Sequence, residues 1–417
     1  MPETPFFSVV TATYGRGRHI VPTIQSVLRQ SFKNFELIVV GDGCDDETES
    51  IVRSFSDARI SWHNLPHNMG SQSFPNNEGI RVSRGDWIAY IGHDDIWTGD
   101  HLSRIHATSL RDRDADFVVS GCVYHTPPGT GIYYINGLFE KPDNAVGYFF
   151  PPSSIAHRRD VTERIGSWQD PRSIAKPVDH DFTQRAIKAG MRFISTGAVT
   201  THKFAAGHRY LSYLRVNSDE QQDMLGALIN GTAPDPAQIV ETAKRAGTYM
   251  LQDSTDYEKA YKPGHVFETN RQNKGLSRPP LSPLHQRTVI RQTPEGRALD
   301  WQNFKRRWPK KFRWSGPNPR PKVLIPYTGQ QARITLETLN LDMSDLSLYV
   351  EDKRIPFRVR RSWVGTLLII AEIPLKTNDY TVLTLEKPTF PLSLFDKRKD
   401  SRPVGIAIAD IVLDPVS

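Results

Sequence analysis

The sequence lacks the features of disulfide-rich and membrane-spanning proteins. Only two cysteines, Cys44 and Cys122, occur among 417 residues, which excludes a disulfide framework and a thiolate zinc site. No apolar run approaches the ~18 residues of a membrane span. The opening segment, MPETPFFSVV, contains neither the basic nor the apolar region of a signal peptide. We therefore expect a cytoplasmic protein.

The length and net charge of the chain place few limits on the class of protein. A chain of 417 residues is too long for one ordinary core and suggests two or three domains. Its hydrophobic fraction of 38% and charged fraction of 24% are typical of a globular protein. The net charge of +7 favours anionic partners such as nucleotide phosphates, anionic lipid or nucleic acid, without choosing among them.

The N-terminal quarter of the chain alternates apolar runs with helical patterns. This alternation predicts an α/β fold with a mostly parallel, Rossmann-like sheet and flanking helices. Ile20, Ile24 and Val27 recur at helical spacing, and the acidic segment 45–48 suits the start of another helix. The predicted strands are Phe7–Ala12, Phe35–Val40, Arg59–His63 and Trp87–Ile91.

Three of these strands run directly into polar loops. The loops are residues 13–16, 41–43 and 92–95. Because the carboxyl ends of parallel strands meet at one edge of a sheet, we expect the three loops to lie together. In open α/β folds this edge is where ligands bind.

The remainder of the chain changes character twice. A strand is predicted at Phe117–Cys122 and a helix at Asp181–Ala189. The Pro-, Arg- and Lys-rich stretch 262–322 indicates a linker or an extended arm, and the short strands after it indicate a small all-β sandwich. We thus predict an α/β domain over 1–215, a helical extension with a linker over 216–321, and a β-sandwich over 322–417.

Asp94 and Asp95 directly follow the apolar strand at Trp87–Ile91. Adjacent carboxylates at a strand end offer hard oxygen ligands that suit Mg²⁺ or Mn²⁺, which could bridge to phosphates. Aspartate is also a common residue at the start of a helix, so the pair by itself leaves both interpretations open.

The ordered series of these elements resembles the family 2 glycosyltransferases, inverting enzymes with the GT-A fold. The resemblance is carried by SVVTATYGRGRHIVPTIQSVLRQSFKNFELIVVGDGCDDET and by NNEGIRVSRGDWIAYIGHDDIW, and covers roughly residues 6–210. It implies a metal-dependent, hexosyltransferase-type enzyme that moves a sugar from a nucleotide-sugar donor to an acceptor hydroxyl.

The resemblance assigns donor-binding roles to several residues. Thr13 and Tyr14 are expected to lie against the nucleobase, and Asp42 to hydrogen-bond the base or the ribose. Asn77 matches an asparagine near the donor. Asp42 could instead be a turn residue, and Asn77 could cap a helix. Asp94 is expected to approach the ribose.

The resemblance also implies a Mn²⁺ or Mg²⁺ site. Asp95 is its expected carboxylate ligand, although Asp94 and Asp95 could exchange roles. His202 lies where some relatives carry a histidine that completes the site, and neutral imidazole is a reasonable Mn²⁺ ligand. A lone histidine is more often structural.

A general base is implied in the segment KPVDHDFTQRAIKAG. Asp179 matches the family residue that deprotonates the acceptor hydroxyl, and Asp181 matches a further acid on the same helix. A positioned base contributes ~10²–10⁴-fold to the rate. The alternative for Asp179 is a helix N-cap, a role that does not exclude catalysis.

Some family residues are missing from this chain. Gly41 and Gly92 stand where many relatives have aspartate, Gly15 where asparagine is frequent, and Asn76 where an arginine is often found. These departures remove donor contacts and leave the nucleotide open among UDP-, dTDP- and GDP-linked sugars.

The expected acceptor is a glycan or a lipid-linked glycan of bacterial-type surface polysaccharide synthesis, with no nucleic-acid partner. Two other functions remain: a sugar nucleotidyltransferase, for which Gly15-Arg16-Gly17-Arg18 is a faint echo of the Gly-rich basic loop, and a non-catalytic glycan-binding protein. The aromatic and basic segment 303–314 could pack as a linker or dock peripherally on anionic lipid. For the β-sandwich, glycan binding, homo-oligomerisation and a structural role stay open.

Overall fold

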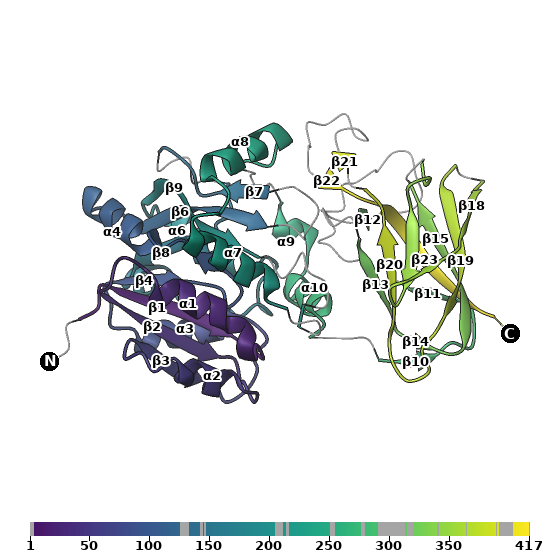
Figure 1. The fold of residues 1–417 in the computed structure, drawn as a ribbon, viewed down its shortest axis with the longest axis horizontal. Coiled ribbons are helices and arrows are strands. Elements are labelled where there is room, and N and C mark those ends of the chain that lie inside the picture. The colour runs from purple at the N-terminus through teal and green to yellow at the C-terminus, as the bar shows by residue number, and fades with distance from the viewer. Residues whose placement is uncertain are drawn as a thin grey trace. The chain divides into compact units, whose positions relative to one another are not determined.

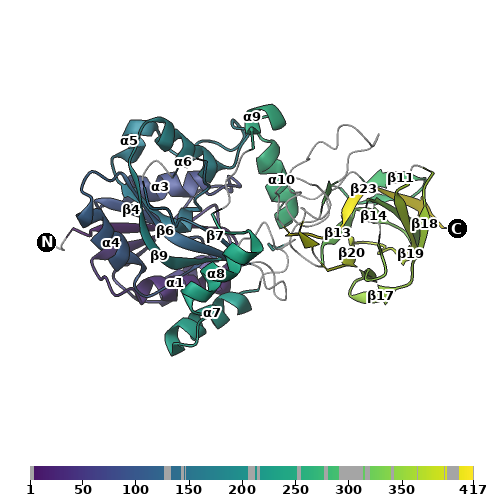
Figure 2. The same cartoon turned by 90° about the horizontal axis from the view of Figure 1, so that it is seen from above.

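A computed structural model describes the chain in two compact units. The first comprises the described residues up to Arg271 except Ser212, and the second comprises Ser212 and the described residues from Gln272 onward. Figures 1 and 2 show the elements in two views. The described residues are 4–125, 133–141, 145, 147–204, 212–213, 217–250, 255–276, 280–290, 313–314, 320–339, 342–363, 365–388, 390–391 and 403–416.

The first unit is built on one large mixed sheet, nine-stranded in the described residues (Figure 1). Its strands are β1 (Phe7–Thr13), β2 (Phe35–Gly41), β3 (Ile60–Asn64), β4 (Trp87–Tyr90), β5 (Ile96–Trp97), β6 (Phe117–His125), β7 (Tyr133–Asn136), β8 (Ile155–Arg158) and β9 (Phe193–Lys203). They lie in the order β3-β2-β1-β4-β8-β6-β9-β5, and β7 pairs with β6. Strands β1 to β4 pair in parallel, as do β6 and β9, whereas β8 is antiparallel to both of its neighbours.

Helices cover both faces of this sheet, as Figure 2 shows. Successive residues of a strand point to opposite faces. Accordingly Val9 packs in one apolar core with Ile24 of α1, and Val10 packs in another with Phe182 of α6. The helical segments are η1 (Gly17–Ile20), α1 (Val21–Leu28), α2 (Thr48–Ser54), α3 (Ser73–Val82), α4 (His101–Arg111), η3 (Pro152–Ser154), α5 (Val161–Ile165), α6 (Val178–Lys188), α7 (Asp219–Asn230), α8 (Pro236–Ala246), α9 (Tyr257–Ala260) and α10 (His265–Lys274).

The carboxyl ends of β1, β2 and β4 meet as the sequence predicted, and ligand binding at this edge stays a prediction. Strand β1 is in register with β2 from Phe7↔Phe35 to Thr13↔Gly41, and it is also parallel to β4. The carboxyl ends of the three strands therefore meet at one edge, as the sequence predicted. Because β1 and β2 are covered on both faces, their sequences are nearly continuous apolar runs.

The second unit is all-β. In the described residues its two main sheets have the orders β11-β23-β15-β19-β18, with β12 beside β23, and β13-β20-β16-β17. The predicted β-rich C-terminal region is confirmed. The strands are β10 (Ser282–Pro283), β11 (Thr288–Ile290), β12 (Arg313–Trp314), β13 (Lys322–Ile325), β14 (Tyr327–Thr328), β15 (Gln331–Thr338), β16 (Ser347–Val350), β17 (Lys353–Ile355), β18 (Arg358–Arg361), β19 (Leu367–Pro374), β20 (Thr381–Glu386), β21 (Phe390–Pro391), β22 (Pro403–Val404) and β23 (Ala407–Pro415).

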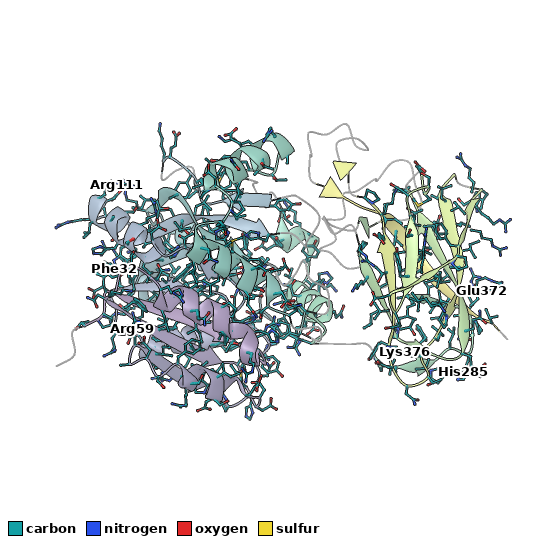
Figure 3. The ribbon with its side chains drawn as sticks, viewed as in Figure 1. Phe32, Arg59, Arg111, His285, Glu372 and Lys376 are labelled. Carbon is teal, nitrogen blue, oxygen red and sulfur yellow. The ribbon has the colours of Figure 1, made fainter. Side chains whose placement is uncertain are left out.

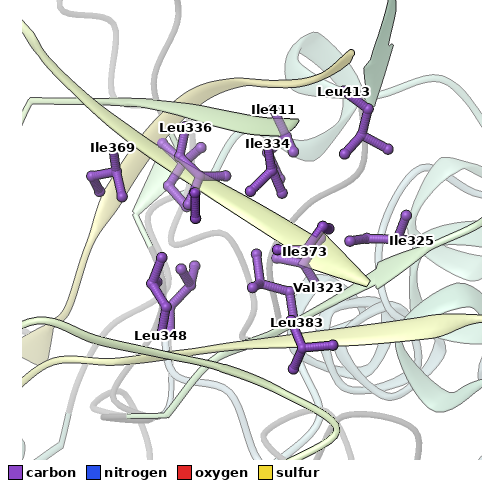
Figure 4. Close-up of a cluster of buried hydrophobic side chains, with 14 of the residues drawn as sticks. Val323, Ile325, Ile334, Leu336, Leu348, Ile369, Ile373, Leu383, Ile411 and Leu413 are labelled. Atoms are coloured by element: carbon purple, nitrogen blue, oxygen red, sulfur yellow. The ribbon is translucent and has the colours of Figure 1, made fainter. Parts of the chain in front are cut away.

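One apolar core joins these two sheets (Figure 4). Leu336 and Ile369 come from the first sheet, and Leu348 and Leu383 come from the second. All four side chains are fully buried. Strand β19 alternates buried and more exposed residues, which is the pattern of a sheet with one covered face.

Replacing Leu336 with Ala should destabilise the second unit by about 2–5 kcal/mol, because it leaves a cavity in this core. Chemical denaturation of the full chain, followed by circular dichroism, would measure the change. Leu281→Ala is the matched control, since 37% of the Leu281 side chain is exposed. Equal losses in the two variants would contradict the assignment of this core.

Charged side chains lie on the outside of both units (Figure 3). Arg59 pairs with Asp57 at 2.7 Å, and Arg333 pairs with Glu372 at 3.5 Å. Exposed pairs of this kind contribute roughly 0–1 kcal/mol each. Each unit is therefore stabilised mainly by its own apolar core, and the surface charges contribute little.

The stretch interpreted from the sequence as a linker contains regular structure. Helix α10 lies within it, β11 pairs with β23, and Arg313–Trp314 forms β12. Strands β11 and β12 were not apparent from the sequence, because their partner β23 lies far along the chain. The remainder of the aromatic and basic segment, residues 303–312, lies outside the described residues. In the described parts of the chain, no helix has the length and apolarity needed to cross a membrane.

Candidate active site

The first residues of the candidate site lie at the carboxyl end of β1. Thr13 is buried, and its carbonyl oxygen accepts a hydrogen bond from the Asp42 amide at 2.8 Å, which joins the ends of β1 and β2. Gly15 has a φ of +54°, a left-handed conformation that favours glycine at this turn. The Tyr14 ring stacks on Tyr213, with centroids 6.4 Å apart. Thr13 and Tyr14 thus lie at the predicted edge, and their contact with a nucleobase stays a prediction.

Asp42 is buried at the end of β2 and holds a neighbouring loop. Its Oδ1 accepts from the Met69 amide at 2.9 Å and its Oδ2 from the Gly70 amide at 2.8 Å. Burial raises the pKa of Asp42, and the two backbone hydrogen bonds oppose that shift. Each carboxylate oxygen has a further lone pair, so the predicted contact with the base or ribose remains open to it.

Asp95 acts as an anchor, by which we mean a buried carboxylate that is hydrogen-bonded on both oxygens within the first unit. Its side chain is 0% exposed. Oδ2 accepts from the Ser153 hydroxyl at 2.5 Å and from the Lys203 ammonium at 2.9 Å, and Oδ1 accepts from the Phe204 amide at 3.0 Å. Burial alone would lower the pKa of Lys203, but the carboxylates of Asp95 and Asp94 raise it above its ordinary value.

Asp94 is the more accessible carboxylate of the pair. Its side chain is 22% exposed, and its Oδ2 lies 4.0 Å from Nε2 of His93. Its backbone oxygen accepts a hydrogen bond from the side-chain Nε2 of Gln221 at 3.2 Å. The sequence left open whether Asp94 approaches the ribose and Asp95 the metal, or the reverse. Asp94 is the more exposed of the two, and its contact with the ribose stays a prediction.

Arg16 and His93 connect the ends of β1 and β4. Nε of Arg16 donates to Nε2 of His93 at 2.9 Å, and Nδ1 of the same ring lies 3.1 Å from the Ala12 carbonyl oxygen. With Nε2 as the acceptor, Nδ1 carries the proton and donates to Ala12. The Arg16 guanidinium lies 3.9 Å from the centroid of Tyr213, an arrangement that fixes a buried positive charge beside the loop of Asp94.

His202 points away from Asp95. Neighbouring residues of a strand face opposite sides, and Lys203 reaches Asp95, so His202 lies on the other side of β9. There its Nδ1 is 3.0 Å from Nε2 of His125, and burial lowers the pKa of His202 to about 4. The predicted ligand pair of Asp95 and His202 therefore does not fit a divalent ion. In the residues that the structure describes, no group of three His, Cys, Asp or Glu side chains is arranged to hold a metal.

Asn77 lies inside α3 and ties it to the segment before α6. Its Nδ2 donates to the Trp168 carbonyl at 3.0 Å, and its Oδ1 accepts from the Trp168 amide at 3.0 Å. The Trp168 ring in turn stacks on Phe182 of α6, at 4.6 Å and 6°. Asn77 is not the N-cap of α3, which is Gln72. Its predicted proximity to the donor stays a prediction.

Asp179 and Asp181 both lie in the first turn of α6 but differ in their partners. Asp181 is buried and pairs with Arg185 at 2.8 Å. Asp179 is half-buried, its Oδ1 accepts from the His180 amide at 3.0 Å, and no cation in the described parts of the chain pairs with it. The N-cap of α6 is Pro177, so Asp179 does not occupy the capping position. Of the two acids, Asp179 is the one available to take a proton.

Sequence reasoning gave no role at this edge to Lys203, Ser153 or Tyr213, and it treated Arg16 only as part of a Gly-rich turn. A signal for Lys203 was present, because strand alternation in TTHKF places it opposite His202. Ser153 and Tyr213 carried no local signal, since their partners are far away in sequence.

Comparison with known proteins agrees with this architecture. Residues 8–160 match the sequence profile of Glycosyl transferase family 2. The chain is 29% identical over 164 residues to the glycosyltransferase GlyG of Streptococcus pneumoniae, covering 39% of this chain and 51% of GlyG. It is 33% identical over 154 residues to the Escherichia coli β-1,3-glucosyltransferase WfgD, covering 36% of this chain and 53% of WfgD. The chain thus spans about half the length of these relatives.

Solved structures show more remote likeness. TarS 1–349 of S. aureus in complex with UDP-GlcNAc is 16% identical with a TM-score of 0.44, covering 63% of this chain and 78% of that one. The mannosyltransferase PcManGT of Pyrobaculum calidifontis, in complex with GDP-Man and Mn²⁺, is 18% identical with a TM-score of 0.39, covering 59% and 77%. From the family profile over residues 8–160 and the mixed sheet, we conclude that the N-terminal domain of this chain belongs to glycosyl transferase family 2 and is a GT-A domain.

Proposed function

We propose that this chain is an inverting glycosyltransferase that moves a sugar from a nucleotide-sugar donor to an acceptor hydroxyl. The observation that carries the proposal is the contrast in the first turn of α6. Asp181 is neutralised by Arg185, whereas Asp179 has no cation partner among the described residues and matches the position of the family's general base.

The proposed reaction is a single displacement at the anomeric carbon. The acceptor oxygen forms a bond to that carbon on the face opposite the diphosphate. The bond from the carbon to the diphosphate oxygen breaks, and its electron pair leaves with the nucleoside diphosphate. The acceptor proton passes to the Asp179 carboxylate. A base positioned in this way contributes ~10²–10⁴-fold to the rate.

The relatives' names suggest the substrate class. WfgD is named for transfer of glucose from UDP-Glc to a GlcNAc-diphosphoundecaprenol, and TuaG of Bacillus subtilis for teichuronic acid biosynthesis. We therefore propose a hexosyl donor linked to UDP, dTDP or GDP, and a glycan or lipid-linked acceptor of bacterial surface polysaccharide synthesis. The cytoplasmic location and the peripheral membrane contact through 303–314 stay predictions.

The family resemblance also implied Mn²⁺ or Mg²⁺. Because the predicted pair of Asp95 and His202 lies on two sides of β9, no step of the proposed reaction passes through a metal ion. Metal dependence stays a prediction that the following experiment tests directly.

The test is a panel of UDP-, dTDP- and GDP-sugars, with binding followed by calorimetry and turnover by release of the nucleoside diphosphate. Each donor is measured with Mn²⁺ and with EDTA. Binding and turnover of one donor would support the transferase. A sugar nucleotidyltransferase would instead join a sugar phosphate to a nucleoside triphosphate and release pyrophosphate. Absence of nucleotide-sugar binding under every condition would overturn the proposal.

A further inference from the structure

Lys203 is held at the ligand edge by a buried carboxylate. It is the last residue of β9, and its Nζ lies 2.9 Å from Oδ2 of Asp95. Asp95 is itself fixed by the Ser153 hydroxyl and the Phe204 amide. The ammonium therefore has a defined position, which a flexible surface lysine does not have.

The Lys203 ammonium is only partly satisfied within the protein. A lysine ammonium has three N–H donors. Within the described part of the chain, Asp95 is its one hydrogen-bond acceptor. The Lys203 side chain is 20% exposed, whereas the Asp95 side chain is 0% exposed. The Asp95 carboxylate thus holds the ammonium from the buried side, and two of the three N–H donors of Lys203 have no acceptor among the described residues.

Two cations and two carboxylates lie close together around Lys203. Asp95 directly follows Asp94, whose charge also acts on Lys203. The same loop is joined through His93 to the buried guanidinium of Arg16. Two fixed cations, Lys203 and Arg16, therefore flank the loop at the end of β4, on the edge where the three parallel strands end. Of the two, Lys203 is the cation whose donors are only partly used within the described residues, and charged N–H donors of this kind suit phosphate oxygens.

We propose that Lys203 binds the diphosphate of the nucleotide-sugar and neutralises the negative charge that develops on it as the sugar departs. This inference rests on the proposed transferase function. It assigns to a resident lysine the charge that the sequence had assigned to a divalent ion on Asp95 and His202. Donor binding is therefore expected to persist in EDTA.

The experiment compares uridine, UDP, guanosine and GDP as probes, titrated by calorimetry into the full chain in EDTA and in Mn²⁺. Lys203→Ala should weaken UDP or GDP binding by on the order of 10- to 100-fold, the usual effect of losing a charged hydrogen bond. It should leave binding of the matching nucleoside unchanged, because the proposal places Lys203 at the diphosphate, which a nucleoside lacks. Lys203→Arg should retain most of the diphosphate affinity.

Lys33→Ala is the matched control, since Lys33 is exposed and precedes the amino end of β2, away from the ligand edge. Lys203→Ala leaves the buried Asp95 carboxylate unpaired and can therefore fail to fold. In that case the double variant Lys203→Met, Asp95→Asn, which removes both charges, is used in place of Lys203→Ala. Thermal denaturation identifies which variant is folded. The same selective loss of diphosphate affinity is expected in the double variant.

Two results would overturn the inference. One is diphosphate binding by the folded Lys203 variants that matches wild type and Lys33→Ala. The other is wild-type binding that EDTA abolishes and Mn²⁺ restores. In both cases wild-type turnover of a nucleotide-sugar would still support the transferase. If wild type binds no nucleoside diphosphate and no nucleotide-sugar, the proposed function fails together with the inference.

Discussion

Asp179→Asn should slow turnover of the nucleotide-sugar by about 10²- to 10⁴-fold while donor affinity stays unchanged. Asparagine has nearly the same shape and can still accept the hydrogen bond that the Asp179 carboxylate takes from the His180 amide, but it cannot take the acceptor proton. The loss should therefore appear in kcat and not in the donor Kd. Steady-state kinetics and calorimetry on one preparation separate the two quantities.

Asp181→Asn is the comparison variant, because it changes the same chemical group two residues further along α6. Its carboxylate is paired with Arg185, so the expected effect is a modest loss of stability with turnover largely retained. If Asp181→Asn loses turnover and Asp179→Asn keeps it, the assignment of the base is reversed. If both variants lose donor binding, the first turn of α6 acts in binding and not in proton transfer.

Asp95→Ala should lower the free energy of unfolding by about 3–5 kcal/mol, the usual effect of removing one partner of a buried ion pair. Three hydrogen bonds disappear together, from Ser153, Lys203 and Phe204. The Lys203 ammonium would then lie in a largely buried site without its counter-charge. Chemical denaturation measures the loss.

Asp94→Ala serves as the control for this prediction, since Asp94 is the adjacent and more exposed carboxylate. We expect it to change stability much less than Asp95→Ala. An Asp95→Ala protein that is as stable as wild type but no longer binds donor would contradict the role of Asp95 as an anchor. That result would favour the alternative that Asp95 contacts the ligand itself.

The sequence by itself determined the frame of the N-terminal domain. The apolar runs of β1, β2 and β4 are long enough to be recognised locally, and each runs into polar residues at its carboxyl end. Parallel pairing then brings those ends together without further information. The β-rich C-terminal unit was predictable for the same reason, because strand alternation is a property of neighbouring residues.

The contrast between Asp179 and Asp181 was also within reach of the sequence. Arg185 lies four residues after Asp181, and residues at that spacing face each other on a helix. The acid left without such a partner is Asp179. A local rule of spacing is therefore sufficient to single out the candidate base from the sequence alone.

The tertiary structure decided what each polar residue contacts. Asp95 meets Lys203 across 108 positions of sequence, Arg16 meets His93 across 77, and Asn77 meets Trp168 across 91. Asp94 and Asp95 are neighbours with the same chemistry, and only burial separates an anchor from an accessible carboxylate. Local pattern fixes the strands and where they end, because apolar periodicity is short-ranged. The charge at the carboxyl edge of the sheet depends on which distant side chains meet there, and only the packed fold brings them together.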